Sequence, residues 1–259
     1  MTKSVVMSDE AKKDYTIGSV ERSVTIIEAL KELERARVDE LVDHLGISKS
    51  SVYTHLITLK RKGLVVQEKN KFHLSLRFLT IGQSARDLRG NSTTIKPYIR
   101  EISDKTGMIT TFMVEENGEG VLLYRESAEQ PLETAKVGKY VALHATSAGK
   151  AILAHLSESK REQILEENTL PKLTENTISK VEQLKKELET VREQGYAVNR
   201  GERISKLWSI AVPILSDDQI YGAIAVVGPR HKVEEKIKNK NLPDYLLGKA
   251  DEIQLDISY

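Results

Sequence analysis

The chain has 259 residues, of which 39% are hydrophobic and 30% charged, so it is long enough for two domains with separate cores. It contains no cysteine, which excludes a disulfide scaffold, a cysteine nucleophile and a thiolate zinc site. The polar N-terminus lacks the apolar segment of a secretory signal, and no apolar run is long enough to cross a bilayer. We therefore expect a soluble, cytoplasmic protein with no membrane partner.

The net charge of +1 hides an asymmetry along the chain. Residues 1–90 carry 16 Lys and Arg against 12 Asp and Glu, whereas the remainder carries 23 against 26. Between Gly46 and Arg77 the chain has seven basic residues and a single acid, Glu68. Because a basic run is often only a solvated surface, charge alone does not distinguish nucleic-acid binding from an ordinary exposed face.

The first strong helical pattern begins at Ser19, a good N-cap residue. The spacing of its apolar residues predicts one buried face formed by Val20, Val24, Ile27 and Leu30. A short second helix is predicted within VDELVDHL, where Gly46 supplies the permissive backbone that ends it.

A third helix is predicted from its N-cap Ser48 to Gly63, with Val52, Leu56 and Leu59 on its buried face. Two helices joined by a turn of three or four residues are typical of a helix-turn-helix. The β-rich runs LVVQE and FHLSL around Lys69-Asn70-Lys71 then predict a hairpin that would serve as a wing.

This arrangement is suited to DNA, because a helix N-terminus rich in hydroxyls offers N–H groups and short side chains to phosphates and base edges. The candidate DNA-contacting residues are Ser48, Lys49, Ser50, Ser51, Tyr53, Thr54, Lys60, Arg61, Lys69 and Lys71. A small helical bundle with a basic surface, or a winged helix that makes only protein contacts, is the alternative.

Residues 77–91 predict a linker helix, ended by Gly90-Asn91-Ser92. Its apolar stripe is typical of a helix that packs on a partner helix, so we expect a dimerisation element there. The stripe consists of Phe78, Leu79, Ile81, Ala85 and Leu88.

From residue 92 the chain mixes helices with strand hairpins, which favours an α+β domain with an antiparallel sheet. A helix ends at Gly107, and Asn117-Gly118 joins the strands TTFMVEE and GVLLYRES. ETAKVGK is a possible third strand. Helices follow in TSAGKAILAHL and ESKREQILEEN, then a longer one capped by Ser179 and ended by Gly195. LWSIAVPIL and IYGAIAVVG form the last two strands.

Five ordered blocks of the chain resemble the IclR family of transcription regulators: SVERSVTIIEAL, ELVDHLGISKSSVYTHLITLKRKGLV, LHATSAGKAILAHL, GYAVNRGE and AIAVVGP. The likeness covers about Tyr15 to Ile257, and the ending LPDYLLGKADEIQLDISY resembles archaeal members. It implies an N-terminal winged helix-turn-helix, a linker helix and a C-terminal GAF-like effector domain. It also implies homodimers or homotetramers that bind palindromic double-stranded DNA operators and respond to small organic acids.

The domain boundaries expected from the residue patterns and the resemblance together are a disordered tail at 1–14, the winged helix-turn-helix at 15–76, the linker helix at 77–91 and the effector-binding and oligomerisation domain at 92–259. Carrying over the family's pocket positions implies an effector site formed by Ser147, Ala148, Asn199, Ser209, Ala225 and Val227. The helix that Thr146 or Ser147 can cap would favour an anionic group such as a carboxylate.

The sequence departs from the family pattern inside this expected pocket. Asn199 stands where the family has an acidic residue, and Ala225 and Val227 stand at hydroxyl positions. A wall of this kind can bury an apolar body but offers few donors to a hydroxylated acid. We therefore expect an aromatic or branched carboxylate as the effector. Separately, we expect the regulator to be a repressor. A closed pocket that binds nothing is the alternative.

Enzymatic functions find little support in the sequence. Gly149-Lys150 faintly resembles a phosphate loop, but His144 and Ala151 stand where such a loop needs Gly and Ser or Thr. We instead expect Lys150 to reach the surface from its helix, and His144 to be structural, although it could meet Glu202 across the fold. Without an acid, base and nucleophile set, we expect no catalytic residue, no metal and no cofactor. An enzyme with a GAF-like domain and a regulatory winged helix remains the alternative function.

Overall fold

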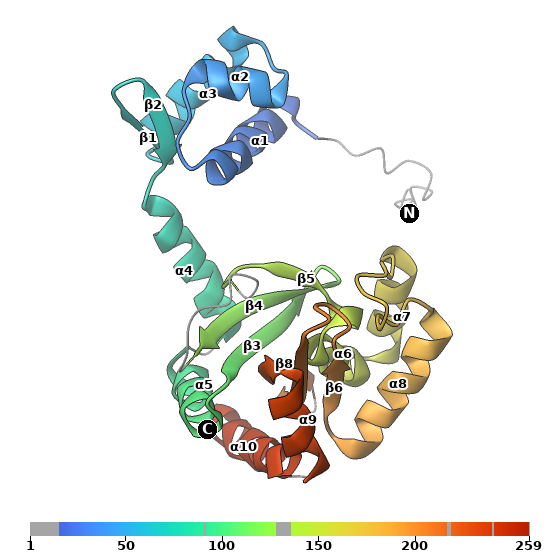
Figure 1. The fold of residues 1–259 in the computed structure, drawn as a ribbon. Helices are drawn as coiled ribbons and strands as arrows, with labels where there is room; N and C mark the ends of the chain where they lie inside the picture. Colours follow the sequence, from blue (N-terminus) through green and yellow to red (C-terminus); the bar gives the residue numbers. More distant parts are fainter. Residues whose placement is uncertain (1–15, 91, 128–135, 217–218, 240, 259) are drawn as a thin grey trace, which may run out of the picture. The chain divides into compact units, whose positions relative to one another are not determined.

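The computed structural model describes residues 16–90, 92–127, 136–216, 219–239 and 241–258, and its fold is drawn in Figure 1. The chain divides into two compact units, residues 1–85 and 86–259, each with a hydrophobic core of its own. Helices and antiparallel strands are both present, so the predicted α+β class is confirmed. The tail expected at 1–14 lies outside the described residues.

The first unit combines three helices with a hairpin: α1 (Gly18–Leu33), α2 (Val38–Leu45), α3 (Lys49–Arg61), β1 (Val65–Glu68) and β2 (Lys71–Leu74). Gly46 ends α2 in the left-handed conformation, as predicted. Lys69 turns the hairpin with a φ of 56°, and Ala36 exchanges backbone hydrogen bonds with Phe72 beside it. The predicted winged helix is confirmed, with Ala36 as an unpredicted third segment of the wing sheet.

The buried face predicted for α1 is wrong in its first half. Val20 and Val24 are 56% and 52% exposed, whereas Ile26, Ala29 and Leu30 form the buried ridge. The predicted cap at Ser19 is also wrong, because α1 begins at Gly18 with Ile17 as its N-cap. The apolar spacing of α1 therefore marks two faces, and one of them is covered by nothing within the described part of this unit.

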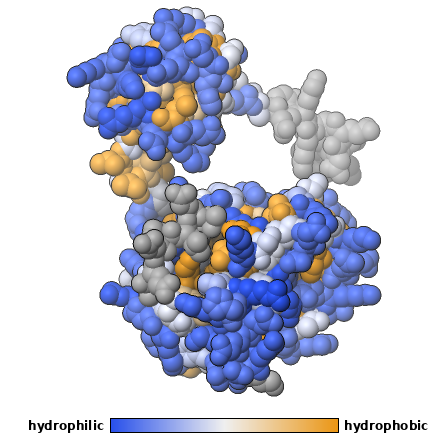
Figure 2. All heavy atoms as spheres, in the orientation of Figure 1, coloured by the Kyte–Doolittle hydropathy of each residue, from blue (hydrophilic) through white to orange (hydrophobic). Residues whose placement is uncertain are grey.

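The predicted linker helix is present as α4 (Arg77–Gly90). Its apolar stripe is largely exposed, since Leu79 is 69% and Leu88 is 87% accessible to solvent. Figure 2 shows hydrophobic surface gathered over this helix on the face in view. Such exposure is typical of a surface that packs against another molecule.

The second unit contains a six-stranded antiparallel sheet in the order β5-β4-β3-β8-β7-β6. Its strands are β3 (Ile109–Glu116), β4 (Glu119–Glu126), β5 (Tyr140–Ala142), β6 (Ala197–Arg200), β7 (Leu207–Ser216) and β8 (Gln219–Pro229). Its helices are α5 (Ser92–Thr106), α6 (Ser147–His155), α7 (Glu158–Glu167), α8 (Val181–Gln194), α9 (Arg230–Lys238) and α10 (Asn241–Ser258), with a 3₁₀ turn η2 (Leu143–Ala145) before α6.

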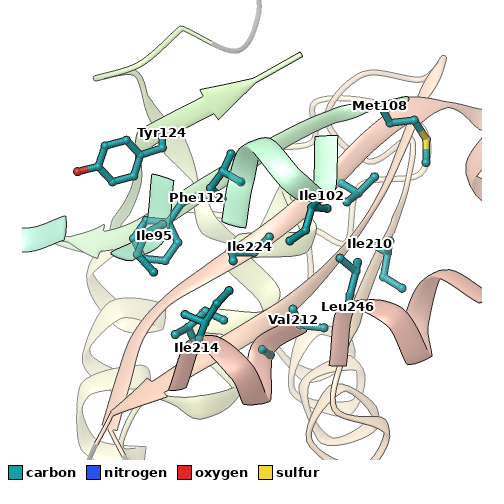
Figure 3. Close-up of a cluster of buried hydrophobic side chains, with 14 of the residues drawn as sticks. Ile95, Ile102, Met108, Phe112, Tyr124, Ile210, Val212, Ile214, Ile224 and Leu246 are labelled. Atoms are coloured by element: carbon teal, nitrogen blue, oxygen red, sulfur yellow. The ribbon is translucent and has the colours of Figure 1, made fainter. Parts of the chain in front are cut away.

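The two faces of this sheet carry side chains of different size. On the face that packs against α5 and α10, large residues such as Phe112 and Ile224 form, together with Leu246 of α10, the core shown in Figure 3. On the opposite face, Ala211 and Ala225 pack against α6. Because successive side chains alternate between faces, one strand supplies both the large and the small set. The small set lets α6 approach the sheet closely.

Two predictions for this unit need correction, and three of its elements were not predicted. The described part of ETAKVGK is a turn, and the third strand is β5, which follows it. Ser179 does not cap α8, which begins at Val181 after the N-cap Lys180. No element was predicted at β6, α9 or α10, although α10 buries Leu246 and Ile253 in the core.

Candidate functional site

The N-terminal half of α3 presents polar side chains on its exposed face. Its buried face consists of Val52, Leu56 and Leu59, as predicted, which leaves Tyr53 and Thr54 on the surface. Thr54 Oγ1 donates to Ser50 O at 2.9 Å, so its hydroxyl is directed back to the helix in the free protein. Ser48 is the N-cap residue by position, but its side chain makes no capping hydrogen bond.

A concave surface joins this end of α3 to two other parts of the first unit. It is lined by Lys49, Ser50 and Tyr53 from the predicted set, together with Arg37, Val38 and Asp39 at the start of α2 and Asn70 at the wing tip. Lys49 Nζ lies 2.6 Å from Asp39 Oδ1, an ion pair that was not predicted. Such a pair cannot be inferred from the sequence, because it depends on how α2 and α3 cross.

The other predicted basic residues do not line this concave surface. Lys60 and Arg61 are at the opposite end of α3, where Lys60 Nζ donates to Gln67 Oε1 at 2.8 Å. Lys69 and Lys71 are exposed at the turn of the hairpin. The first unit thus offers cations at both ends of α3 and on the wing, with the hydroxyl groups between them.

The second unit contains a cavity of about 90 Å³ at the N-terminus of α6. All six residues of the predicted effector site, Ser147, Ala148, Asn199, Ser209, Ala225 and Val227, line this one cavity. The remaining lining residues are Ile109, Thr111, Met113, Leu122, Lys139, Val141, Ala145, Thr146, Arg203, Ile204 and Leu207. Most of the lining is therefore aliphatic, with a few hydroxyl groups.

Strand register explains how distant residues meet on the floor of this cavity. Asn199 pairs with Ser209, Ser209 with Val227, and Val227 with Ile109, so the four form one row across β6, β7, β8 and β3. Above the row, Ser147 Oγ lies 2.7 Å from Ser209 Oγ. The cavity thus lies between the first turn of α6 and the small-residue face of the sheet.

The N-cap and first turn of α6 line the cavity through Thr146, Ser147 and Ala148. Thr146 is its N-cap and accepts a hydrogen bond from Gly149 N at 3.0 Å, which settles the choice between Thr146 and Ser147. The N–H groups of Ser147 and Ala148 belong to the first turn, which has no intrahelical partners for them. Helix N-termini carry partial positive charge and favour carboxylates and other anions.

Asn199 builds the cavity wall with both ends of its amide. Nδ2 donates to Ala145 O at 2.6 Å, and Oδ1 accepts from the N–H groups of Gly201 and Glu202 at 3.0 and 3.1 Å. A carboxylate at this position could accept the latter two bonds but could not donate to Ala145. The asparagine therefore ties η2 to the loop after β6 and leaves the wall poor in free donors.

Two basic side chains line the cavity, Lys139 before β5 and Arg203 after β6, and none of the described lining residues is acidic. Burial lowers the pKa of the Arg203 guanidinium from its ordinary value, because the charged form is partly desolvated there. Neither residue was predicted as part of the site. A single basic residue in a loop gives no sequence signal for such a site, and only the fold brings Lys139 and Arg203 to the cavity.

The expectation that Lys150 reaches the surface is wrong. Its side chain is 0% exposed, and Nζ contacts Glu187 Oε1 at 2.8 Å and Glu202 Oε1 at 2.9 Å. The reason is that α6 is covered on both sides, by the sheet and by α8, so no path to solvent is open. Gly149 beside it serves packing, since a Cβ there would lie 2.1 Å from the Leu143 carbonyl oxygen.

His144 is buried against the segment before α8, where its Nε2 lies 3.2 Å from Pro171 O. Burial lowers the pKa of His144, while the Pro171 carbonyl and Glu202 oppose that shift. Within the described ranges no three His, Cys, Asp or Glu residues are grouped to hold a metal ion. None of the described helices is both long and apolar enough to cross a membrane.

Two sequence families match the chain along most of its length. The IclR helix-turn-helix domain matches residues 19–69, and the family described as bacterial transcriptional regulator IclR C-terminal matches residues 87–256. The chain is 30% identical to the probable HTH-type transcriptional regulator ArcR of Halobacterium salinarum over 249 residues, covering 92% of this chain and 93% of that protein. It is also 30% identical to the regulator KdgR of Escherichia coli, with 80% of each chain covered.

Solved structures agree with these sequence matches. The IclR of Thermotoga maritima superposes with a TM-score of 0.79 at 26% identity, covering 94% of this chain and all of that one. An IclR homologue from Microbacterium hydrocarbonoxydans, complexed with 4-hydroxybenzoate, superposes with a TM-score of 0.73 at 22% identity, covering 92% and 98%.

Proposed function

Because the chain belongs to the IclR family of transcriptional regulators, we propose that it represses transcription by binding a palindromic operator as a homo-oligomer. The family consists of transcriptional regulators and not of enzymes, so the enzymatic alternative is set aside. The chain is a DNA-binding regulator whose family includes a ligand-bound homologue. We further propose a cytoplasmic location, and below we propose the contacts with DNA, the class of ligand and the symmetry of the operator.

The proposed DNA interface uses the N-terminal half of α3 for bases and the lysines around it for phosphates. Support comes from the exposed Tyr53, Thr54 and Ser50 between cations at both ends of the helix and on the wing. Polar side chains read base edges in the major groove, whereas lysines neutralise phosphates without reading sequence. The proposed contacting residues are Ser48, Lys49, Ser50, Ser51, Tyr53, Thr54, Lys60, Arg61, Lys69 and Lys71.

The proposed effector is a small carboxylate with an apolar body. The observation that carries this proposal is the cavity at the start of α6, which has Lys139, Arg203 and a helix N-terminus around it and no described acid in its lining. The aliphatic floor of Ile109, Ala225 and Val227 suits a branched or aromatic body. That a related protein binds 4-hydroxybenzoate agrees with this ligand class.

The proposed assembly is a dimer, with a tetramer as a pair of dimers. A single winged helix reads only a few base pairs, so useful specificity requires two copies on two half-sites. The exposed stripe on α4 is the proposed contact between the copies. Two-fold symmetry of the protein would then be mirrored by an inverted repeat in the operator.

Thermal-shift screening tests the ligand proposal. We expect benzoate, 4-hydroxybenzoate and isovalerate to raise the unfolding temperature, and glyoxylate and gluconate to leave it unchanged. Val227→Asp should remove the response, since it adds a negative charge to the apolar wall that faces the ligand. Stabilisation by glyoxylate or gluconate alone, undiminished in Val227→Asp, would refute an apolar-bodied carboxylate.

A further inference from the structure

Lys150 is a fully buried lysine whose role is not explained by DNA binding or by direct contact with the cavity. Its Nζ donates to Glu187 Oε1 at 2.8 Å, Glu202 Oε1 at 2.9 Å and Val198 O at 2.7 Å. An ammonium group has three protons, so each of its donors has an acceptor. The lysine therefore has one well-defined geometry, fixed by three different parts of the chain.

A contribution to stability does not by itself explain why a lysine is buried at this position. The charges of Lys150 and Glu202 are both taken out of water, and replacing such a buried pair with apolar groups of similar volume is often neutral or stabilising. Methionine would fill nearly the same volume within α6. The three acceptors lie on β6, on the loop after β6 and on α8, so what the lysine adds is a fixed arrangement of these elements.

Glu202 stands where that loop becomes the wall of the cavity. The residues that follow it, Arg203 and Ile204, line the cavity directly. The loop is tightly folded, since Gly201 has a φ of 80° and a Cβ there would lie 2.7 Å from Ser205 O. Glu202 O accepts a hydrogen bond from Thr177 Oγ1, so the backbone of Glu202 is fixed as well as its side chain.

The same helix holds the opposite side of the cavity. Ser147 and Lys150 are three residues apart on α6 and thus lie on one face of the helix. Ser147 contacts Ser209 at the cavity, while Lys150 contacts Glu202 behind the wall. Moving α6 relative to the loop would therefore change the position of Arg203 relative to the helix N-terminus.

We propose that Lys150 is a positioning residue for the ligand cavity, which holds Glu202 so that Arg203 and Ile204 face the N-terminus of α6. The inference rests on the proposed function of that cavity as the effector site. Within the described residues, Glu202 Oε1 accepts from Lys150 Nζ at 2.9 Å and from Arg200 N at 3.3 Å, and Oε2 has no hydrogen-bond partner. Lys150 is therefore the charged hydrogen-bond partner of this buried carboxylate. Loss of Lys150 alone would leave an unpaired buried charge, and the loop would move to solvate it.

The test compares Lys150→Met, Glu202→Gln and the double variant with a matched control, Lys185→Met. Lys185 on α8 forms an ion pair with Glu162 on α7, also at 2.8 Å, but this pair is about one-third exposed and neither residue lines the cavity. The readouts are the unfolding temperature, amide hydrogen exchange in residues 201–207, and the dissociation constants for benzoate and isovalerate by calorimetry.

We expect the double variant to unfold near the wild-type temperature, with exchange in residues 201–207 about tenfold faster and both acids bound about tenfold more weakly. Lys185→Met should change neither exchange nor affinity. Wild-type exchange and affinity in a folded double variant would overturn the proposal, because Lys150 would then only fill space. If the double variant does not fold, hydrogen exchange in residues 201–207 and acid affinity are measured in Glu202→Gln alone, and the same results support or overturn the positioning role.

The two proposals fail in distinguishable ways. If the wild type binds neither acid but exchange in residues 201–207 still accelerates in the double variant, the proposed ligand class is wrong and the positioning role stands. If the wild type binds an acid and the double variant binds it equally well, the positioning role is wrong and the effector site stands.

Discussion

Lys49 Nζ lies 2.6 Å from Asp39 Oδ1, so the first lysine of α3 is ion-paired within the protein's own DNA-binding unit. Both side chains are about two-thirds exposed, so the pair itself adds little stability. The ion pair instead affects how strongly Lys49 can bind DNA phosphates. A carboxylate beside the lysine repels phosphates and competes with them for the same ammonium group.

Asp39→Asn should therefore strengthen binding to any duplex. Freeing one cation should steepen the dependence of log affinity on log salt concentration by about one. If the two proteins bind equally at 1 M salt, this slope makes the variant bind roughly eightfold more tightly at 0.1 M salt. Fluorescence anisotropy with a random-sequence duplex over a salt series measures both quantities. Asp43→Asn, on the same helix and also exposed, is the control. Equal effects of the two substitutions would mean that net charge, and not the Lys49 pair, is responsible.

The lysines of the wing and the polar side chains of α3 should affect different properties of DNA binding. Lys69→Gln and Lys71→Gln are each expected to weaken binding to all sequences and to flatten the salt dependence by about one. Tyr53→Phe and Thr54→Ala should instead change which bases are preferred, by about 1–3 kcal/mol for each hydrogen bond to a base that is removed. Binding selections on randomised duplexes, read at two salt concentrations, distinguish these outcomes. If the Tyr53 and Lys69 variants change base preference and salt dependence in the same way, the proposed separation between base contacts and phosphate contacts is wrong.

The exposed stripe of α4 should be needed for assembly. Leu79→Ser removes an exposed leucine from the proposed contact, and each buried leucine is worth about 1.5–3 kcal/mol, twice over in a two-fold dimer. Light scattering at micromolar concentration should show a shift towards monomer, with helix content unchanged. Leu173→Ser, at another exposed leucine, should leave the mass unchanged. A wild-type protein that is monomeric on DNA would contradict the proposed assembly.

Gly149 should tolerate no side chain, for reasons of packing and not of ligand binding. In Gly149→Ala the new Cβ would lie 2.1 Å from the backbone oxygen of Leu143, so α6 must move away from η2. We expect a loss of about 1–3 kcal/mol in the free energy of unfolding, as for overpacked cores. Gly248→Ala is the control, because its Cβ meets open space within α10 and alanine favours helix by about 1 kcal/mol. Denaturant unfolding of both variants should show opposite signs.

The winged helix could be predicted from the sequence because its signals are local. Gly46 and Gly63 mark helix ends, and Val52, Leu56 and Leu59 mark one buried face. The face of α1 was assigned wrongly because Val20 and Val24 follow the same spacing but have nothing in the described part of this unit to cover them. Periodicity shows which residues share a face, but not whether that face is buried within the chain or against another molecule.

For the cavity too, features set by neighbouring residues could be predicted from the sequence, and features set by distant segments could not. The first turn of α6 was predictable from Thr146 and Ser147, whereas the row from Asn199 to Ile109 depends on strand register across four strands. Arg203 and the burial of Lys150 could not be predicted, because both depend on elements that are far apart in the sequence. The family resemblance supplied six lining positions, but it did not supply the cations.

The most direct test of ligand-responsive regulation is footprinting on the DNA upstream of the protein's own gene, with and without the acid that stabilises it most, for the wild type and for Val227→Asp. We predict an inverted-repeat footprint for both proteins, and a change of at least about tenfold in wild-type affinity when the acid is added. In Val227→Asp the acid should have no effect, while affinity without the acid stays unchanged. An acid that occupies the wild-type cavity without changing DNA affinity, or that acts equally on Val227→Asp, would contradict ligand-responsive regulation through this cavity.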